Sequence, residues 1–143
     1  DYIHMKTTNE CIDFIIETTK DVPHSGSNLT NHLLGVHSLM LQTNAPEYLC
    51  LAGLFHSIYG TEYFDYDKPI NRKFVRDYIG KEAEELVFLF CHLADRDETI
   101  LKSENKDLIY LGLINLVETY YADRSDKNVF DMMNRFKDAY QSF

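Results

Sequence analysis

The apolar run Leu49–Phe55 constrains the fold of this chain more than any other segment. Pro46 stands three residues before it, in the position that suits the first turn of a helix. A helix that is apolar on nearly every side cannot lie on a surface, because water would face part of it. The sequence therefore predicts a helix over about Pro46–Ser57 at the centre of the fold.

Apolar residues recur at spacings of three and four through the rest of the chain, and period-two alternation is missing. Asn28 and Asn71 are expected to cap helices. With 143 residues and 45% hydrophobic residues, the chain can bury a real core. We expect one all-α domain over residues 1–143, with about seven helices, a loop at 60–70 and a break at 95–97. Besides the central helix, the expected helices are about Asn9–Lys20, Asn28–Gln42, Asn71–Gly80, Lys81–Leu93, Glu104–Ala122 and Asp126–Tyr140.

The charge of the chain excludes some classes of function. The formal net charge is −9, which argues against a general binder of nucleic acid or of anionic membranes. No apolar run reaches the length of a membrane span. We expect a cytoplasmic protein that binds a small-molecule ligand, with a second copy of the chain as a candidate partner.

Two histidines stand out because each interrupts a segment that otherwise reads as a buried helix. His32 lies beside the apolar stripe of the second expected helix, and His56 ends the central helix. A buried imidazole needs a partner, and neutral imidazole nitrogen is a good ligand for zinc, iron or manganese. Two packed helices can bring such side chains to one point.

These motifs resemble the HD superfamily of metal-dependent phosphohydrolases. Ser25-Gly26 precedes His32 at the spacing found in the domain that hydrolyses the alarmone guanosine tetraphosphate, and Leu54-Phe55-His56-Ser57 resembles the end of that family's central helix. The resemblance covers about Pro23–Arg124 and extends to HD-type oxygenases such as inositol oxygenase, which use a di-iron centre. It is closest to an uncharacterised group of small HD-like proteins with an altered His-Asp doublet. It implies an all-α, HD-like bundle.

The resemblance also implies a set of metal ligands. The family's third ligand lies in a Leu-Ala-Asp-Arg pattern, which Tyr121–Arg124 matches at the more fitting distance and Leu93–Arg96 also matches. His32, His56 and Asp123 are therefore the expected ligands for Mn, Zn, Fe or Mg, unless no metal is bound. Two features depart from the family: Ser57 replaces the doublet aspartate, and Gly60-Thr61 stands where a Glu-Asp pair is expected.

Other polar residues compete for places at this site. His92 is a candidate third imidazole, and otherwise a structural histidine at a helix end. Asn115 and Glu118 share a helix face and compete with Asp123, although an amide at this position could instead bond to a histidine ring. Ser57 and Glu118 are the candidate catalytic side chains.

The candidate substrate-binding residues are mostly basic or aromatic. Arg72 and Arg76 share a helix face and could grip a phosphate, or they could pair with an acidic neighbour (Asp77, Glu82 or Glu84). Arg96 could act similarly. His24 could reach the mouth of the site, and Tyr59 could form a water-excluding lid with the nearby aromatics Tyr63, Phe64 and Tyr66.

Three functions fit these patterns. The first is a divergent HD-domain hydrolase that acts on a small phosphorylated or nucleotide-like substrate. The second is an oxygenase-like enzyme with iron held by His32, His56 and His92. The third is a non-enzymatic binding or scaffold protein in which the two site histidines are hydrogen-bonded to neighbours such as Ser57 or Asn115.

Overall fold

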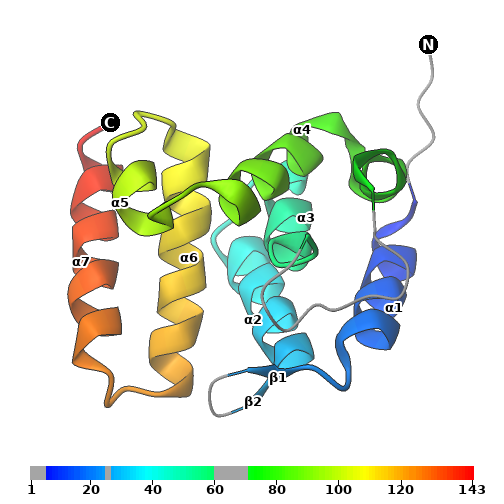
Figure 1. Ribbon diagram of the computed structural model, residues 1–143, viewed down its shortest axis with the longest axis horizontal. Coiled ribbons are helices and arrows are strands. Elements are labelled where there is room, and N and C mark those ends of the chain that lie inside the picture. Colours follow the sequence, from blue (N-terminus) through cyan, green and yellow to red (C-terminus); the bar gives the residue numbers. More distant parts are fainter. Residues whose placement is uncertain (1–5, 25–26, 60–70) are drawn as a thin grey trace.

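The structure is a computed structural model that describes residues 6–24, 27–59 and 71–143. Its described part is built mainly of helices, as the sequence predicts (Figure 1). The helices are α1 (Thr8–Thr19), α2 (Leu29–Gln42), α3 (Glu47–Phe55), α4 (Arg72–His92), α5 (Arg96–Leu101), α6 (Lys106–Ala122) and α7 (Lys127–Gln141). Among the described residues, no helix combines the length and apolar character needed to cross a membrane.

Helix α3 lies at the centre, which confirms the expectation from its apolar sequence. It contacts α1, α2, α4 and α6, and every residue from Leu49 to Phe55 is buried. In Figure 1, α3 is enclosed by α2, α4 and α6, with α1 at one end of the molecule and α7 at the other. Because α3 ends at the core, His56 directly after it is placed in the interior.

Side-chain caps set most helix starts. The capping residues accept hydrogen bonds from backbone N–H groups two or three residues later, which satisfies donors that the first helical turn leaves free. These residues are Thr7, Asn28, Asn71, Asn105 and Asp126. The predicted caps Asn28 and Asn71 are thus confirmed.

Helix α4 consists of two arms joined at Gly80. This residue has φ 85° and ψ 168°, a conformation open to glycine because it has no Cβ. Figure 1 shows the two arms running in different directions. The expected boundary between two helices at Gly80 is therefore present as a kink.

One sequence-based expectation needs correction. The segment expected to be a break contains α5, which starts after Asp95 in a left-handed conformation (φ 46°) and is anchored by fully buried Ile100. The chain also forms two strands, β1 (Pro23–His24) and β2 (Ser27–Asn28), which pair antiparallel. Both elements are too short to give a periodic pattern.

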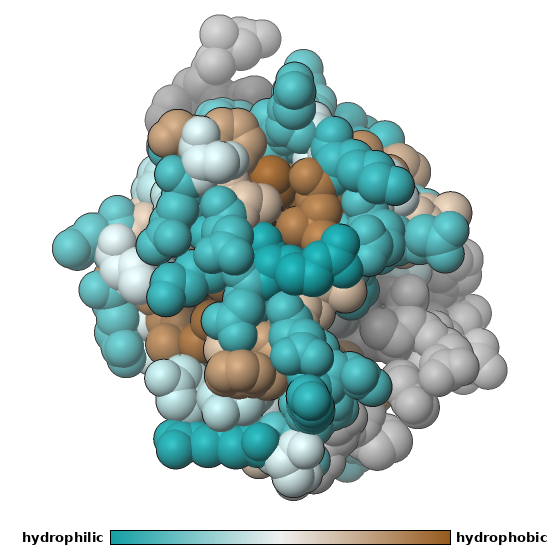
Figure 2. All heavy atoms as spheres, turned by 90° about the vertical axis from the view of Figure 1, so that its left-hand side faces the viewer, coloured by the Kyte–Doolittle hydropathy of each residue, from teal (hydrophilic) through white to brown (hydrophobic). Residues whose placement is uncertain are grey.

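Helix α7 packs mainly against α6 and also touches α5. Its fully buried side chain is Phe136, which lies over Gly112 of α6. Figure 2 looks onto this end of the molecule, where hydrophilic side chains dominate and apolar side chains show between them. Helix α7 therefore covers α6, the helix that carries Asn115 and Glu118.

Candidate functional site

The structure brings His32 of α2 and His56 together. Both residues are almost fully buried, with 3% and 2% of their surface exposed. Their Nε2 atoms lie 3.3 Å apart, although 24 residues separate them in sequence. The close packing of α2 on α3 produces this meeting, because Gly53 lets Val36 and Met40 of α2 approach the α3 backbone.

Asn115 of α6 completes the cluster. Its Oδ1 lies 2.8 Å from Nε2 of His32 and 3.1 Å from Nε2 of His56. One turn further along α6, a carboxylate oxygen of Glu118 contacts Nδ1 of His32. A Cβ on residue 35 would lie 2.9 Å from Cγ of Glu118, so Gly35 provides the space in which this side chain reaches the ring.

The outer contacts fix the orientation of both rings. Nδ1 of His56 donates to the carbonyl oxygen of Gly53 at 2.7 Å, and Nδ1 of His32 donates to Glu118. In a neutral imidazole the other nitrogen, Nε2, then carries a lone pair. When both rings are neutral, the two Nε2 atoms and Oδ1 of Asn115 direct lone pairs at one another, an arrangement that a cation between them would stabilise.

Burial keeps His56 neutral. It lowers the pKa of His56 to about 3, with further lowering by the charges of His32 and Arg96. The hydrogen bonds with Gly53 and Asn115 act in the opposite direction and raise it. At neutral pH the His56 ring is consequently an uncharged donor of one lone pair.

These separations suit a metal ion. Ligand atoms about 2.0–2.1 Å from one metal are about 3.3 Å apart in a tetrahedral arrangement and about 3.0 Å apart when adjacent in an octahedral one. The three measured distances, 2.8, 3.1 and 3.3 Å, fall near these values. The donors are two imidazoles and an amide. In the described ranges, no group of three His, Cys, Asp or Glu residues is placed to hold a metal. A bond from a ligating histidine to a carboxylate or carbonyl is also the usual outer contact of a metal site.

The placement of Asp123 corrects the expected ligand set. Asp123 is exposed at the C-terminal end of α6, where its carboxylate accepts hydrogen bonds from the backbone and hydroxyl of Ser125. These bonds lower its pKa. Asp123 lies eight residues beyond Asn115, or about 12 Å along the helix. Asn115 therefore occupies the position beside the two histidines that was expected for Asp123.

The structure also separates His92 from the cluster. Its exposed ring stacks on Phe88, and its Nδ1 bonds to the carbonyl oxygen of that residue at 2.9 Å. Tyr59 lies beside this ring and donates its hydroxyl to Glu84 at 2.8 Å. The other expected lid aromatics, Tyr63, Phe64 and Tyr66, lie outside the described residues.

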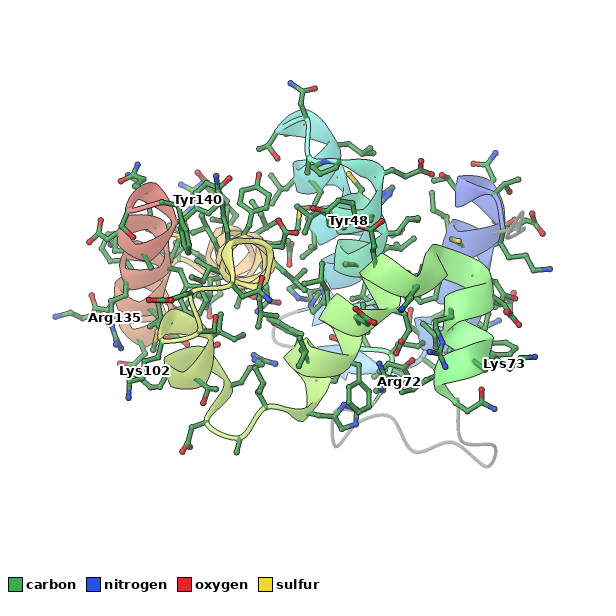
Figure 3. All side chains as sticks on the ribbon, turned by 90° about the horizontal axis from the view of Figure 1, so that it is seen from above. Tyr48, Arg72, Lys73, Lys102, Arg135 and Tyr140 are labelled. Atoms are coloured by element: carbon green, nitrogen blue, oxygen red, sulfur yellow. The ribbon has the colours of Figure 1, made fainter. Side chains whose placement is uncertain are left out.

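The two arginines expected to bind a phosphate, Arg72 and Arg76, instead contact a carboxylate of the protein. Arg72, at the start of α4 (Figure 3), donates from Nε and Nη2 to the two oxygens of fully buried Glu84, at 2.9 and 3.0 Å. Arg76 approaches the same carboxylate at 4.0 Å. This contact corrects the substrate-binding role expected of the pair and favours the alternative of an acidic neighbour.

Arg96 is the basic candidate that remains near the histidines. Its guanidinium carbon lies 4.3 Å from the ring centroid of Phe90, whose ring meets that of His56 edge to face. Nε of Arg96 is buried, makes no hydrogen bond with the described residues and lies 3.6 Å from Asp97.

Ser57 and His24 complete the predicted set. Ser57 is buried directly after His56. His24 lies in β1, and its side chain is outside the described part of the structure.

A comparison with protein families assigns the chain. A family model described as "Domain of unknown function (DUF6817)" matches residues 16–96, more than half of the chain. The chain belongs to the DUF6817 family. The DUF6817 match contains His32 and His56, whereas Asn115 and Glu118 lie beyond it. No curated protein and no solved structure matches the chain.

The depressed pKa of His56 predicts acid sensitivity of the metal-free protein. The ring titrates near 6.5 when unfolded and near 3 when folded, so the unfolded state binds more protons in between. The contribution of neutral His56 to the free energy of unfolding is therefore fully present above about pH 6.5 and is lost as the pH falls toward 3. We expect His56 to contribute a loss of about 2 kcal/mol between pH 7 and pH 5. Urea unfolding with a chelator should show that difference for the wild type and not for His56→Gln, and equal pH profiles would contradict it.

Proposed function

We propose that this DUF6817 protein binds one divalent transition-metal ion between His32, His56 and Asn115, on a scaffold like that of the HD superfamily. The ion serves the hydrolysis of a small phosphorylated or nucleotide-like substrate. The convergence of the two Nε2 atoms and Oδ1 of Asn115 supports the metal site. The resemblance of the motifs around His32 and His56 to metal-dependent phosphohydrolases supports the reaction.

Each residue of the cluster has a separate role in this proposal. His32 and His56 hold the ion through Nε2, and Asn115 adds a neutral oxygen. Glu118 is a positioning residue, because its bond to Nδ1 fixes the ring of His32. When bound, the ion supplies Lewis-acid chemistry for hydrolysis. Arg96 is a predicted substrate-binding residue whose positive charge acts on His56, which favours an anionic substrate.

Two neutral imidazoles and an amide also indicate the type of metal. Imidazole suits zinc, iron, copper and nickel, whereas magnesium and manganese prefer carboxylate oxygens. We therefore expect zinc or iron to bind more tightly than manganese or magnesium. Asn115→Asp should reverse part of this preference by adding a charged oxygen at the same position.

Elemental analysis and calorimetric titration test the metal site. We expect about one equivalent of metal in the wild type, and loss of at least about 90% of it in His56→Ala and in Asn115→Leu. His92→Ala is the matched control, because it removes an imidazole outside the cluster and should leave metal content unchanged. Asn115→Asp should bind manganese about tenfold more tightly than the wild type.

A different result would favour a structural network. The amide of Asn115 contacts both rings, so an amide turned to donate one N–H to each ring would give a hydrogen-bonded core without a metal. Absence of metal after supplementation, together with a stable and correctly folded wild type, would contradict the proposed site and support the scaffold alternative. Metal binding without hydrolysis of a nucleotide panel would contradict only the reaction. The oxygenase alternative lacks a third imidazole in the described cluster.

A further inference from the structure

A groove follows the N-terminal turn of α3, at the opposite end of that helix from His56. Three adjoining pockets of about 300, 430 and 210 Å³ form it. The first two share Glu47 and Leu51, and the last two share Tyr48 and Glu82. We call this feature the α3 groove; it passes from the C-terminal part of α2, past the kink of α4, to the start of α6.

The floor of the α3 groove is apolar. Leu51, Ile79 and Leu86 line it and are buried. At its two ends Leu41 and Leu89 are 56% and 39% exposed. Apolar surface gathered in a groove with a polar rim is typical of a site that binds another molecule.

The rim of the α3 groove is acidic. Among the described residues, four carboxylates line this rim, Glu47, Glu82, Glu85 and Asp107, and one cation, Lys81. Tyr48 donates its hydroxyl to Asp107 at 2.7 Å and so joins α3 to α6 across the groove. Figure 3 looks onto this end of the molecule and shows Tyr48 among α3, α4 and α6. The charge of the rim therefore complements a basic occupant.

We propose that the α3 groove docks a basic amphipathic helix of a partner protein. The leucines and isoleucine of the groove would contact the apolar face of that helix, and its lysines or arginines would meet the carboxylates on the rim. The second arm of α4 from Lys81 to Leu89 is about 12 Å long, which matches about two turns of a bound helix. This binding needs no metal and is independent of the proposed function.

A model peptide tests the docking surface in the full chain. The probe is a fluorescent helical peptide of about 14 leucines and lysines at amphipathic spacing, and anisotropy measures its affinity. We expect Glu82→Lys/Glu85→Lys to weaken binding at least about tenfold. Asp13→Lys/Glu17→Lys on the exposed side of α1 makes the same change in net charge and should weaken binding less than about twofold.

The apolar contribution has its own matched pair of variants. Leu89→Glu should weaken binding, whereas Ile16→Glu, at a residue exposed to the same degree but outside the groove, should not. Three outcomes would overturn the proposal: equal effects of both charge reversals, equal binding of oligolysine without leucine, or a dimer in sedimentation that Leu89→Glu dissociates. The dimer would assign the groove to a second copy of this chain.

Discussion

Gly112→Ala is expected to lower the free energy of unfolding by about 2 to 3 kcal/mol. A Cβ on residue 112 would overlap Cε2 of Phe136, closer than two carbon atoms can approach. Phe136 is fully buried, so its ring can move only by displacing its neighbours or by separating α7 from α6. We expect about 3 to 4 kcal/mol of overpacking strain, offset by about 1 kcal/mol because alanine favours the helix. Chemical denaturation measures the difference.

A second substitution separates steric strain from other effects of Gly112→Ala. Phe136→Leu alone should destabilise the protein, because it removes buried volume. In Gly112→Ala/Phe136→Leu the added methyl group fills part of that space, so the double variant should be more stable than Gly112→Ala alone. Strictly additive losses would show that the contact between α6 and α7 is not the cause.

The contact between α6 and α7 also bears on the proposed metal site. Gly112 lies three residues before Asn115 on α6, and Glu118 lies three residues after it. Helix α7 thus packs against α6, which supplies the amide oxygen and the carboxylate near His32. If the ring of Phe136 moves α6 away, metal affinity and stability should fall together in Gly112→Ala.

Much of the architecture could be predicted from local sequence. The apolar run before His56 placed a helix at the centre, and Asn28, Asn71 and Gly80 marked boundaries that the structure contains. These features depend on contacts within a few residues or on helical periodicity alone. The short helix α5 and the paired strands depend on tertiary contacts, so local patterns did not reveal them.

The membership of the candidate site was harder to predict, because it depends on how α6 is placed beside α2 and α3. The Ala-Asp-Arg pattern indicated Asp123, but packing of the buried face of α6 places Asn115 beside the histidines. Asn115 and Glu118 were among the alternatives because both lie within an apolar stretch. The face of a helix can be predicted from sequence, whereas its axial position against distant helices cannot.

The same limit applies to Arg72 and Arg76. The two arginines share one helix face, as their spacing predicts. Their partner Glu84, however, lies on the second arm of α4, beyond the Gly80 kink. Without the angle between the two arms, the sequence leaves both a phosphate and an internal carboxylate open as partners. The angle decides the matter, because it directs Glu84 toward Arg72 and away from solvent.

Glu84→Leu is expected to lower the free energy of unfolding by about 2 to 3 kcal/mol, the cost of losing a hydrogen bond to a buried charged group. Glu84 is fully buried and accepts a hydrogen bond from the hydroxyl of half-buried Tyr59. Burial and this carboxylate raise the pKa of Tyr59. Leucine leaves that hydroxyl without its acceptor. The side chain of Arg72 is 40% exposed, so water can replace the carboxylate there, and we assign no additional loss to it.

Two comparisons isolate this effect. Glu84→Leu/Tyr59→Phe removes the hydroxyl as well, and it should recover part of the stability lost in Glu84→Leu. Glu98→Leu breaks the exposed pair with Arg135 and should have a much smaller effect, because both partners are about half exposed. If Glu84→Leu and Glu98→Leu proved equally mild in urea unfolding, Glu84 would not stabilise the contact between Tyr59 and the two arms of α4. A large loss in Glu84→Leu with metal content unchanged would instead assign Glu84 to the fold and leave metal binding to His32, His56 and Asn115.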